Sequence, residues 1–372
     1  MTPWDTLAGQ YQLHPGASPA IVGQRPVLAT GRLGQLLRGQ RGAQVSASLG
    51  SLFTLCAHVH RRTAELALAA AHSTPPLTPP APVLLVLETA RDHLRSIALD
   101  WPQRLPDAVP GALSLQWLRG SPLPLVSALP VSEATVAWRT LAALRSWLED
   151  KILGQDATQW LIDQRDPDAL ARWCADHAER VLPARCLAAW QPLASPLRPA
   201  LRSLDVLDAD VAVQTAHLTQ LAQSIALVPD FVQYPSWLGQ PAETGAWTRL
   251  RHRSAPAHPH SAWARLSARW LELIELAAAT PDVATPLLAS GALPLAPGQA
   301  LAWCEMARGL LLHWVQLDAT GAVQDYRVLA PTEWNFHPDG ALGLAVAALA
   351  PCDNAAARAL AAAYDPCVAC TV

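Results

Sequence analysis

The prolines of this chain divide it into segments, because an internal proline breaks or kinks a helix. There are 33 prolines among 372 residues, and the segments between them are rich in alanine and leucine. The proline-free stretch Ser46–His72 predicts one helix. The same reasoning predicts helices at Val83–Leu99, Ser132–Leu153, Pro167–Val181, Val206–Leu227, Ser261–Ala279 and Asn354–Tyr364. Most of the chain is therefore expected to be helical.

Two regions depart from the helical pattern and predict a small β element. The first 45 residues are rich in glycine and glutamine and contain short apolar runs, which suggest brief strands or irregular structure. Between Leu310 and Leu329, two β-prone runs flank Asp318–Gly321, a pattern typical of a hairpin. The predicted fold class is therefore mainly α with a small β element (α+β). We expect one domain over residues 1–372, made of an irregular part at 1–45, a helical core at 46–290, and a hairpin, last helix and tail at 300–372.

Charge and hydropathy argue against two classes of partner. The formal net charge is −3, charged residues make up 15% of the chain, and the basic ones are scattered. A nucleic-acid binder concentrates positive charge on one face, so no nucleic-acid partner is expected. No uncharged apolar run is long enough to span a bilayer and the N-terminus lacks the pattern of an export signal, so we expect no membrane and a cytoplasmic location. The odd number of cysteines, seven, favours reduced thiols over a disulfide framework.

Two of the seven cysteines, Cys367 and Cys370, form a Cys-x-x-Cys pair close to Val372, where the chain stops. A turn with this spacing brings two sulfurs together, and thiolates favour soft metal ions such as iron, zinc or copper(I). A redox dithiol and two incidental cysteines are the alternatives. A redox pair normally opens a helix, whereas this pair follows the last predicted helix, so a metal site is the interpretation that we follow.

A pair of thiolates cannot complete a metal site, so further ligands must come from elsewhere in the chain. Cys56 and His60 are four residues apart and would share one face of the predicted helix, whereas His58 would point elsewhere. Cys56 is then a candidate ligand, and His60 a ligand or a hydrogen-bond donor to its sulfur. The alternative is that Cys56 is a small buried hydrophobe, and that interpretation is given to the remaining cysteines, which are Cys174, Cys186, Cys304 and Cys352.

Four stretches, in order along the chain, resemble the large subunit of nickel-iron hydrogenases. The tail "DPCVAC" is similar to the C-terminal Asp-Pro-Cys-x-x-Cys motif of that family, and Cys56 with His60 is similar to its N-terminal cysteine motif. "EMARGLLLHW" (Glu305–Trp314) and "APTEWNFHPDG" (Ala330–Gly340) resemble two segments between them, and "ETGAWTR" is a weaker match. The resemblance implies a reduced large-subunit fold in which the Cys56 helix and the tail meet at the centre.

The same resemblance implies a metal site that has lost one ligand. Cys56 and Cys370 match the two thiolates that bridge nickel and iron, and Cys367 matches a thiolate that binds nickel alone. Phe53 stands where the family has its fourth cysteine. The resemblance therefore implies that a site for iron is kept, while nickel is not expected.

The iron of this family carries two cyanides and one carbon monoxide, and the residues that hold those ligands have matches here. Arg308, together with Thr332 and Pro331, occupies the corresponding positions. Without the resemblance, a surface arginine before a strand and a threonine in a turn would be the simpler interpretations. His60 and Asp365 are expected to tune the thiolates by contacting them from outside the ligand set.

Other departures argue against hydrogen turnover. Ala307 replaces a proline, Glu333 replaces a small polar residue, and the family's Arg-Ile-Glu-Gly-His segment is missing near residues 20–45. The stop at Val372 would leave no tail for a maturation protease, which is a further expectation from the resemblance.

A large-subunit relative with these losses resembles the hydrogenase expression/formation proteins of the HupK/HoxV type. That resemblance implies an assembly scaffold without turnover, which carries an Fe(CN)2CO unit transiently. Its expected partners are a small hydrogenase maturation chaperone, an iron-loading maturation protein, and the hydrogenase large subunit precursor as acceptor. Two alternatives stay open: a metal-free interaction or chaperone protein, and a divergent hydrogenase large subunit with catalytic activity.

Overall fold

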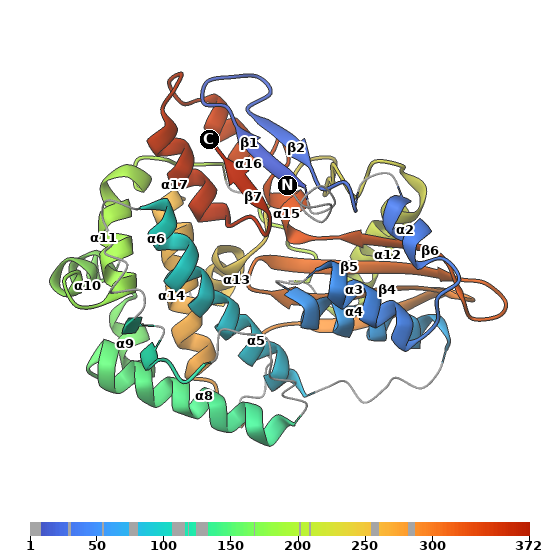
Figure 1. Cartoon of the computed structure of the whole chain (residues 1–372), viewed down its shortest axis with the longest axis horizontal. Coiled ribbons are helices and arrows are strands. Elements are labelled where there is room, and N and C mark those ends of the chain that lie inside the picture. The colour runs from blue at the N-terminus through green and yellow to red at the C-terminus, as the bar shows by residue number, and fades with distance from the viewer. Residues whose placement is uncertain are drawn as a thin grey trace.

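The computed structural model describes residues 9–372 except 29–30, 54–55, 74–80, 106–115, 118, 124–132, 167, 201, 208–209, 254–259 and 282–286. Helices gather on one side of the protein and a four-stranded sheet lies on the other (Figure 1). The predicted class, mainly α with a small β element, is confirmed.

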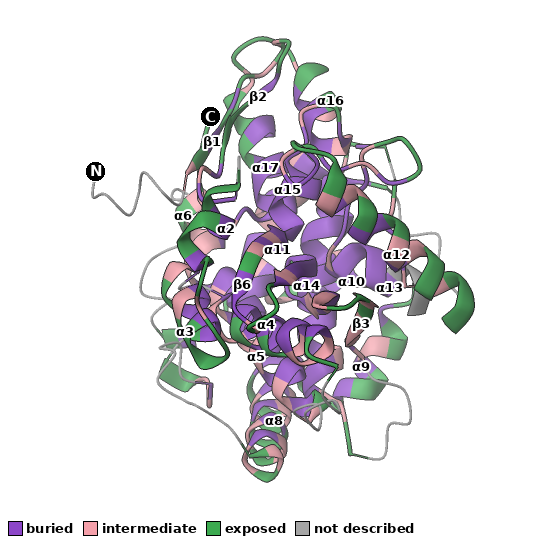
Figure 2. Ribbon diagram, turned by 90° about the vertical axis from the view of Figure 1, so that its right-hand side faces the viewer, coloured by how far each residue is buried: buried purple, intermediate pink, exposed green. Residues whose placement is uncertain are grey.

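Helix α14 (Ala262–Ala277) forms the centre of the helical side. Nearly all of its residues are buried, and the Ser261 side chain caps it by accepting a hydrogen bond from the backbone N–H of Ala264. The helices packed around it are α5 (Pro82–Arg95), α8 (Ala134–Leu148), α9 (Ala157–Asp163), α11 (Leu182–Ala194), α13 (Ala246–Arg253) and α17 (Asn354–Tyr364). Helix α10 (Ala169–His177) packs on α11. Figure 2 shows the buried interior that these helices share.

The larger sheet is an antiparallel meander of β3 (Ser290–Ala296), β4 (Gln299–Met306), β5 (Gly309–Leu317) and β6 (Val323–Leu329). Successive side chains of a strand point to opposite faces, so each face contacts a different helix. Ala302 and Cys304 of β4 belong to the main core, towards α4 (Ala57–Ala71). Leu301 belongs instead to the cluster formed with α12 (Val211–Leu227). The sheet is therefore covered on both faces.

A second, three-stranded sheet joins the two ends of the chain. Strand β1 (Gln10–Leu13) pairs antiparallel with β2 (Ile21–Gln24) and parallel with β7 (Ala369–Thr371). In this register Tyr11 lies beside Cys370. The C-terminal tail is thus held by backbone pairing, as Figure 1 shows for β1 and β7.

Shorter elements connect these layers. They are α2 (Arg32–Leu37), α3 (Ala43–Leu52), the π-helices η3 (Ser96–Asp100) and η4 (Glu149–Leu153), α6 (Trp101–Arg104), α15 (Pro331–Asn335) and α16 (Ala341–Ala347). Among the described residues, the helices are all too short or too polar to cross a bilayer.

The prediction of one helix over Ser46–His72 is wrong. Two helices, α3 and α4, form there instead, and the helical backbone stops at Phe53, which has φ −113° and ψ 64°. The Phe53 ring stacks on the imidazole of His60, with ring centroids 3.9 Å apart. An aromatic residue is only a moderate helix former, so tertiary packing can override a helical pattern at such a position.

The β element is larger than predicted. The hairpin β5–β6 is present, and the Asp318 side chain caps its turn by accepting from the N–H groups of Thr320 and Ala322. Two further strands, β3 and β4, precede it, and β3 begins at residue 290, where the helical core was expected to end. Alanine, leucine and proline dominate β3, and these residues carry no strong strand signal.

The remaining predicted helices are present with shifted ends. Those expected at Val83–Leu99, Ser261–Ala279 and Asn354–Tyr364 are confirmed as α5 with η3, as α14 and as α17. Helix α12 starts later than predicted, because the Asp210 side chain caps it by accepting from Ala212 and Val213. Helix α10 is shorter than predicted, and α8 continues as η4. The predicted starts at Ser132 and Pro167 lie outside the described residues.

Candidate functional site

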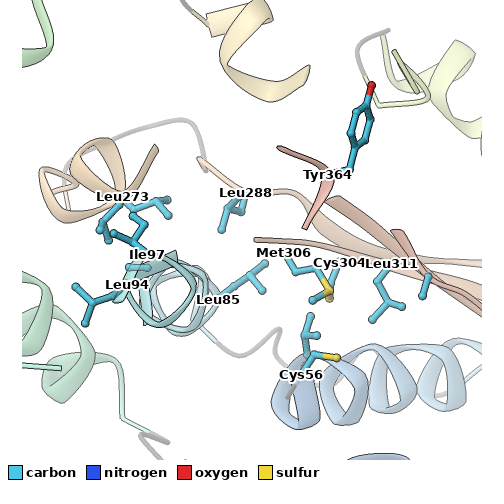
Figure 3. Close-up of a cluster of buried hydrophobic side chains, with 14 of the residues drawn as sticks. Cys56, Leu85, Leu94, Ile97, Leu273, Leu288, Cys304, Met306, Leu311 and Tyr364 are labelled. Carbon is cyan, nitrogen blue, oxygen red and sulfur yellow. The ribbon is translucent and has the colours of Figure 1, made fainter. Parts of the chain in front are cut away.

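Cys56 lies at the junction between α3 and α4 rather than within a helix. It is the N-cap residue of α4, and its backbone N–H donates to the carbonyl of Phe53. Its side chain is 5% exposed and lies opposite Cys304 and Met306 of β4 (Figure 3). The break in the predicted helix therefore brings this thiol to the interior, beside the large sheet.

Cys367 shares the surroundings of Cys56. Burial and the neighbouring Cys367 raise the pKa of the Cys56 thiol, and the guanidinium groups of Arg308 and Arg25 oppose that rise. The hydroxyl of Thr332 lies 3.1 Å from the Cys367 sulfur, within hydrogen-bond distance. The structure thus brings two of the three predicted ligands into one cluster of side chains beside two arginines. We call this cluster of Cys56, Cys367, Arg308, Thr332 and Arg25 the pocket.

Cys370 does not join this pair. It lies in β7, where burial raises the pKa of its thiol to about 11 and Arg104 is the charge that opposes the rise. Among the described residues, no three His, Cys, Asp or Glu side chains are grouped so that they could hold a metal ion. With β7 paired to β1, the two sulfurs that remain as donors for a soft metal are those of Cys56 and Cys367. The role of Cys370 as a ligand stays a prediction.

Asp365 organises the arginines beside the thiols rather than contacting sulfur itself. Its Oδ2 forms ion pairs with Arg269 Nη1 at 3.0 Å and with Arg308 Nε at 3.2 Å. Its Oδ1 accepts from the Ser96 hydroxyl of the π-helix η3 at 3.2 Å. Burial raises the pKa of Asp365, but Arg269 and Arg308 outweigh burial and hold it well below its usual range. The carboxylate is therefore ionised and fixes Arg308.

Arg308 and Thr332 are buried, so the simpler interpretations as a surface arginine and a turn threonine are wrong. Arg308 lies between β4 and β5, and its Nε also donates to the backbone carbonyl of Asp365. Among the described residues, its Nη groups make no hydrogen bond. Thr332 sits in the first turn of α15, directly after the buried Pro331. A guanidinium and a hydroxyl thus line the pocket as donors.

In the part of the chain that the structure describes, His60 forms its hydrogen bond with another histidine and with neither sulfur. Its Nδ1 lies 3.0 Å from Nε2 of His313, and His313 Nδ1 lies 2.7 Å from the Tyr326 hydroxyl. Burial, His313 and Arg25 lower the pKa of His60, so this imidazole is neutral at pH 7. The predicted donor to Cys56 is instead part of a polar chain that runs into the sheet.

Arg25 and Glu333 form a buried ion pair at the same pocket, which the sequence did not reveal. Nη1 of Arg25 lies 3.4 Å from Oε1 of Glu333, and both side chains are buried. The guanidinium carbon lies 5.6 Å from the centre of the Phe53 ring. A buried carboxylate requires a partner. The acidic Glu333 within a largely apolar segment therefore indicated that some partner exists, but it did not indicate which one.

Tyr11 lines a cavity of about 240 Å³. Burial is the main cause that raises the pKa of the Tyr11 hydroxyl. Glu333 and Cys367 raise this pKa further, and Arg25 lowers it. The ring packs against Phe336, with centroids 5.0 Å apart, and both rings line the cavity. Tyr11 and Phe336 therefore form an aromatic side of this cavity, and Cys367 is close enough to Tyr11 to act on its hydroxyl.

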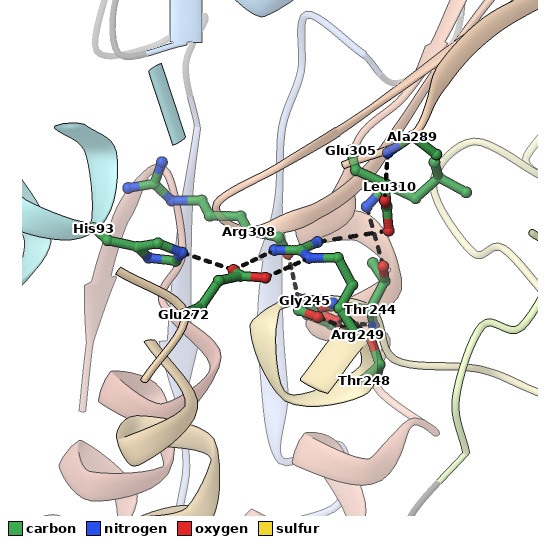
Figure 4. Close-up of polar contacts among 11 residues, drawn as sticks. His93, Thr244, Gly245, Thr248, Arg249, Glu272, Ala289, Glu305, Arg308 and Leu310 are labelled. Atoms are coloured by element: carbon green, nitrogen blue, oxygen red, sulfur yellow. Dashed lines mark hydrogen bonds and ion pairs between the residues drawn. The ribbon is translucent and has the colours of Figure 1, made fainter. Parts of the chain in front are cut away.

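A second buried ionic group lies beside Arg308 and holds α14 to its neighbours (Figure 4). Oε1 and Oε2 of Glu272 accept from Arg249 at 2.8 and 2.7 Å, and Oε2 also lies 2.8 Å from His93 Nε2. Glu272 is fully buried, and Arg249 holds its pKa well below the usual range despite burial. This group joins α5, α13 and α14, and α14 also carries Arg269, the ion-pair partner of Asp365.

The other four cysteines divide into two groups. Cys174, Cys186 and Cys304 are fully buried, as expected of small hydrophobes. Cys352 is exposed and has φ 65°, so the prediction of a buried residue is wrong there.

Comparison with known proteins gives this site a context. A family model described as "Nickel-dependent hydrogenase" matches residues 248–372. The chain is 40% identical to the hydrogenase expression/formation protein HoxV of Cupriavidus necator, covering 100% of this chain and 97% of that one. It is 30% identical to the hydrogenase expression/formation protein HupV of Azotobacter chroococcum, covering 93% and 91%. The hydrogenase expression/formation protein HupK of Rhizobium leguminosarum is 37% identical over 40% of this chain and 43% of its own. A crystal structure of an NAD+-reducing nickel-iron hydrogenase in its H2-reduced state superposes with a TM-score of 0.48 at 13% identity, over 93% of this chain and 92% of that one.

Proposed function

The chain belongs to the family of hydrogenase expression/formation proteins that includes HoxV, and on that premise we propose that it carries an Fe(CN)2CO unit during nickel-iron hydrogenase assembly. The observation that supports the proposal most is the pocket in which Cys56 and Cys367 lie together, beside Arg308 and the Thr332 hydroxyl. Two thiolates suit iron, and two donors suit its cyanides. The iron unit is cargo here, and no turnover is proposed.

The positions of two hydrogen-bond donors support such a cargo. Cyanide nitrogens accept hydrogen bonds, and a buried guanidinium fork is a strong partner for an anionic acceptor. Asp365 fixes Arg308 through Nε, which keeps the Nη end of the fork available for a ligand. Thr332 lies against Cys367, so its hydroxyl is beside the iron that this sulfur would bind.

A carrier has to release its cargo, and the pocket suits that requirement. Phe53 stands where the hydrogenase resemblance expects a cysteine, so the site offers fewer thiolates than a complete nickel-iron site. Fewer thiolates give weaker binding, and without the fourth one nickel is not expected to bind. Arg308 and Arg25 oppose the rise in the pKa of Cys56 that burial causes, so they favour the thiolate form that the cargo needs.

Cys370 enters this proposal as a ligand that arrives later. Strand β7 pairs with β1 over three residue pairs, and this pairing places Cys370 beside Tyr11. Each backbone hydrogen bond contributes about 0.5–1.5 kcal/mol net. So short a pairing is weak enough for a metal–thiolate bond to displace, and the tail would then close over the cargo.

The proposed partners follow from the cargo. A small hydrogenase maturation chaperone and an iron-loading maturation protein would deliver the unit in the cytoplasm, and the hydrogenase large subunit precursor would accept it. The large-subunit character of residues 248–372 supports this role. A scaffold that resembles the acceptor offers the donor a similar surface.

Infrared spectroscopy and metal analysis would test the proposal. The protein is purified without air from cells that express the maturation machinery, as wild type, as Cys56→Ala and as Cys367→Ala. Cys174→Ala is the matched control, because Cys174 is buried but lies far from the pocket in α10. We expect cyanide and carbonyl bands with iron and without nickel, lost in the first two variants and kept in the control.

Each other outcome would identify a different function. A metal-free protein without bands that still captures maturation partners would be an interaction protein. Bands accompanied by nickel would indicate a divergent hydrogenase.

A further inference from the structure

The further inference concerns Arg25, which lies just after strand β2. Its side chain is 5% exposed, and Nη1 lies 3.4 and 3.5 Å from the two carboxylate oxygens of Glu333. Its Nε is buried and has no hydrogen-bond partner among the described residues. A donor that is buried without an acceptor is costly. A bound ligand with a hydrogen-bond acceptor would remove this cost at the Arg25 Nε.

The Arg25 guanidinium is charged and lies near both thiols. Its partner Glu333 directly follows Thr332, whose hydroxyl contacts the Cys367 sulfur. The Phe53 ring beside the guanidinium belongs to the residue whose carbonyl accepts from the Cys56 N–H. Burial lowers its pKa, but Cys367 and then Glu333 raise it above the ordinary value, and Cys56 contributes in the same direction. The only buried ion pair that the guanidinium forms among the described residues is the one with Glu333. A fixed positive charge therefore stands beside both sulfurs.

Phe53 fixes the place of that charge. Its ring lies between two groups: it stacks on His60 with centroids 3.9 Å apart, and it lies 5.6 Å from the guanidinium carbon of Arg25. An aromatic face attracts a cation, most strongly in a desolvated setting. The position where the hydrogenase resemblance expects a cysteine thus holds a ring with a cation beside it.

We propose that Arg25 determines which metals this pocket accepts: held by Glu333 and Phe53, its guanidinium supplies the positive charge of a second metal ion. This inference rests on the proposed carrier function, because it assigns the selectivity of the same site. A second divalent cation would meet a fixed like charge beside the thiols, which disfavours it. An anionic ligand of a bound iron unit would find a donor in the free Nε.

The charges of the loaded site agree with this role. Iron(II) with two cyanides and one carbon monoxide is neutral, so binding by two thiolates brings the site to −2. Two guanidiniums, those of Arg25 and Arg308, offset that charge. Asp365 is offset separately by Arg269, at 3.0 Å. With the Glu333 carboxylate that pairs with Arg25 also counted, the loaded site carries one net negative charge, and a second dication would reverse it to one net positive charge.

Titration of the metal-free protein with nickel(II) under argon tests the selectivity, with thiolate-to-nickel absorption as the readout. We expect Arg25→Gln to bind nickel roughly tenfold more tightly than wild type, because a fixed like charge is removed. Arg25→Lys keeps the charge and should bind nickel as weakly as wild type. Arg32→Gln is the matched control, since Arg32 is an exposed arginine seven residues later in the chain. Equal nickel affinities of Arg25→Gln and Arg32→Gln would overturn the inference.

Glu333→Gln provides a test that does not depend on how well Arg25→Gln folds. It removes the counter-charge and leaves the guanidinium, so nickel affinity should fall below that of wild type. An unchanged or higher nickel affinity would contradict the proposed role. For Arg25→Gln itself, folding is expected to survive, because burial already raises the pKa of Glu333 and the carboxyl can take up a proton.

The two proposals can fail separately. Iron with cyanide and carbonyl bands, together with unchanged nickel affinity in both Arg25→Gln and Glu333→Gln, would keep the carrier function and reject the selectivity role. Higher nickel affinity in Arg25→Gln, without bands in wild type, would keep the selectivity role and reject the iron unit as cargo.

Discussion

Replacing Asp365 by alanine is expected to destabilise the protein strongly, because this carboxylate holds two buried arginines at once. Arg269 and Arg308 lie 3.0 and 3.2 Å from its Oδ2, and Ser96 donates to its Oδ1. Asp365 is also the C-cap residue of α17, with φ 44°, and lies two residues before Cys367. The substitution therefore affects both the helix end and the pocket.

The magnitude follows from the burial of all three charged groups. Removing one partner of a buried ion pair leaves an uncompensated charge and costs about 3–5 kcal/mol. Arg269 keeps a hydrogen bond to the carbonyl of Ala363, and Arg308 keeps the electrostatic attraction of Asp92. These remaining contacts keep the loss within that range. A loss of this size is a large part of a total stability of about 5–15 kcal/mol.

Urea denaturation of metal-free Asp365→Ala would measure the loss, with Asp353→Ala as the matched control. Asp353 is the N-cap residue of the same helix, and its side chain accepts from Ala356 N at 3.1 Å near the surface. Removing such a cap costs about 1 kcal/mol. If Asp365→Ala lost no more stability than Asp353→Ala, the reasoning about the buried charges would be refuted.

The stability difference between wild type and Asp365→Ala should also depend on pH. The pKa of Asp365 is lowered in the folded state, because Arg269 and Arg308 outweigh burial. Its stabilisation is therefore complete above the pKa of an unfolded aspartate, about 4, and is lost as the pH falls below that value. The stability difference between wild type and Asp365→Ala should shrink between pH 5 and pH 2. A constant difference over that interval would contradict the assignment.

Three further substitutions probe the surroundings of the site. Burial and Asp92 raise the pKa of Glu88 to about 8, so ionisation of this carboxyl lowers the stability of the protein as the pH rises from about 4 towards 8. Glu88→Gln should remove that loss, which urea midpoints at pH 5 and pH 8 would measure. If the midpoint of the variant fell with pH as much as that of wild type, the assignment would be wrong. Thr332→Val removes the hydroxyl that lies 3.1 Å from the Cys367 sulfur. It should shift the infrared bands of the cyanides in the loaded protein, whereas Thr332→Ser, which keeps a hydroxyl, should not. Identical spectra of wild type and Thr332→Val would exclude a contact between this hydroxyl and a cyanide. Glu272→Ala leaves Arg249 buried without its carboxylate and should cost about 3–5 kcal/mol in urea unfolding; a loss below about 1 kcal/mol would show that the group is not structural.

Local signals in the sequence were sufficient for much of the helical scaffold. Proline-free, alanine-rich segments predicted α5, α14 and α17, and Ser261 and Asp353 cap two of them as short polar residues do. The turn at Asp318–Gly321 and the hairpin around it were also readable, because turn chemistry is local. These features depend on residues within a few positions of each other.

The break at Phe53 and the ion pair of Arg25 could not be read in this way. Phe53 leaves the helix because its ring packs against His60 and beside Arg25, which are tertiary contacts. Arg25 and Glu333 are 308 positions apart in sequence. Nothing near Arg25 marks it as a site residue, so only the fold could bring it to the thiols.

The tail shows how one motif is compatible with two arrangements of its thiols. In extended backbone, residues three apart face opposite sides, whereas a turn brings them together. Here the chain bends at Cys367 and then continues as β7, so Cys367 faces Thr332 while Cys370 follows the register of β1 beside Tyr11. The spacing of the two cysteines permits a shared metal, but the pairing of β7 with β1 decides whether they share one. In the proposed carrier, binding of a metal by Cys370 would therefore be linked to release of β7, and weakening that pairing would strengthen a three-thiolate site.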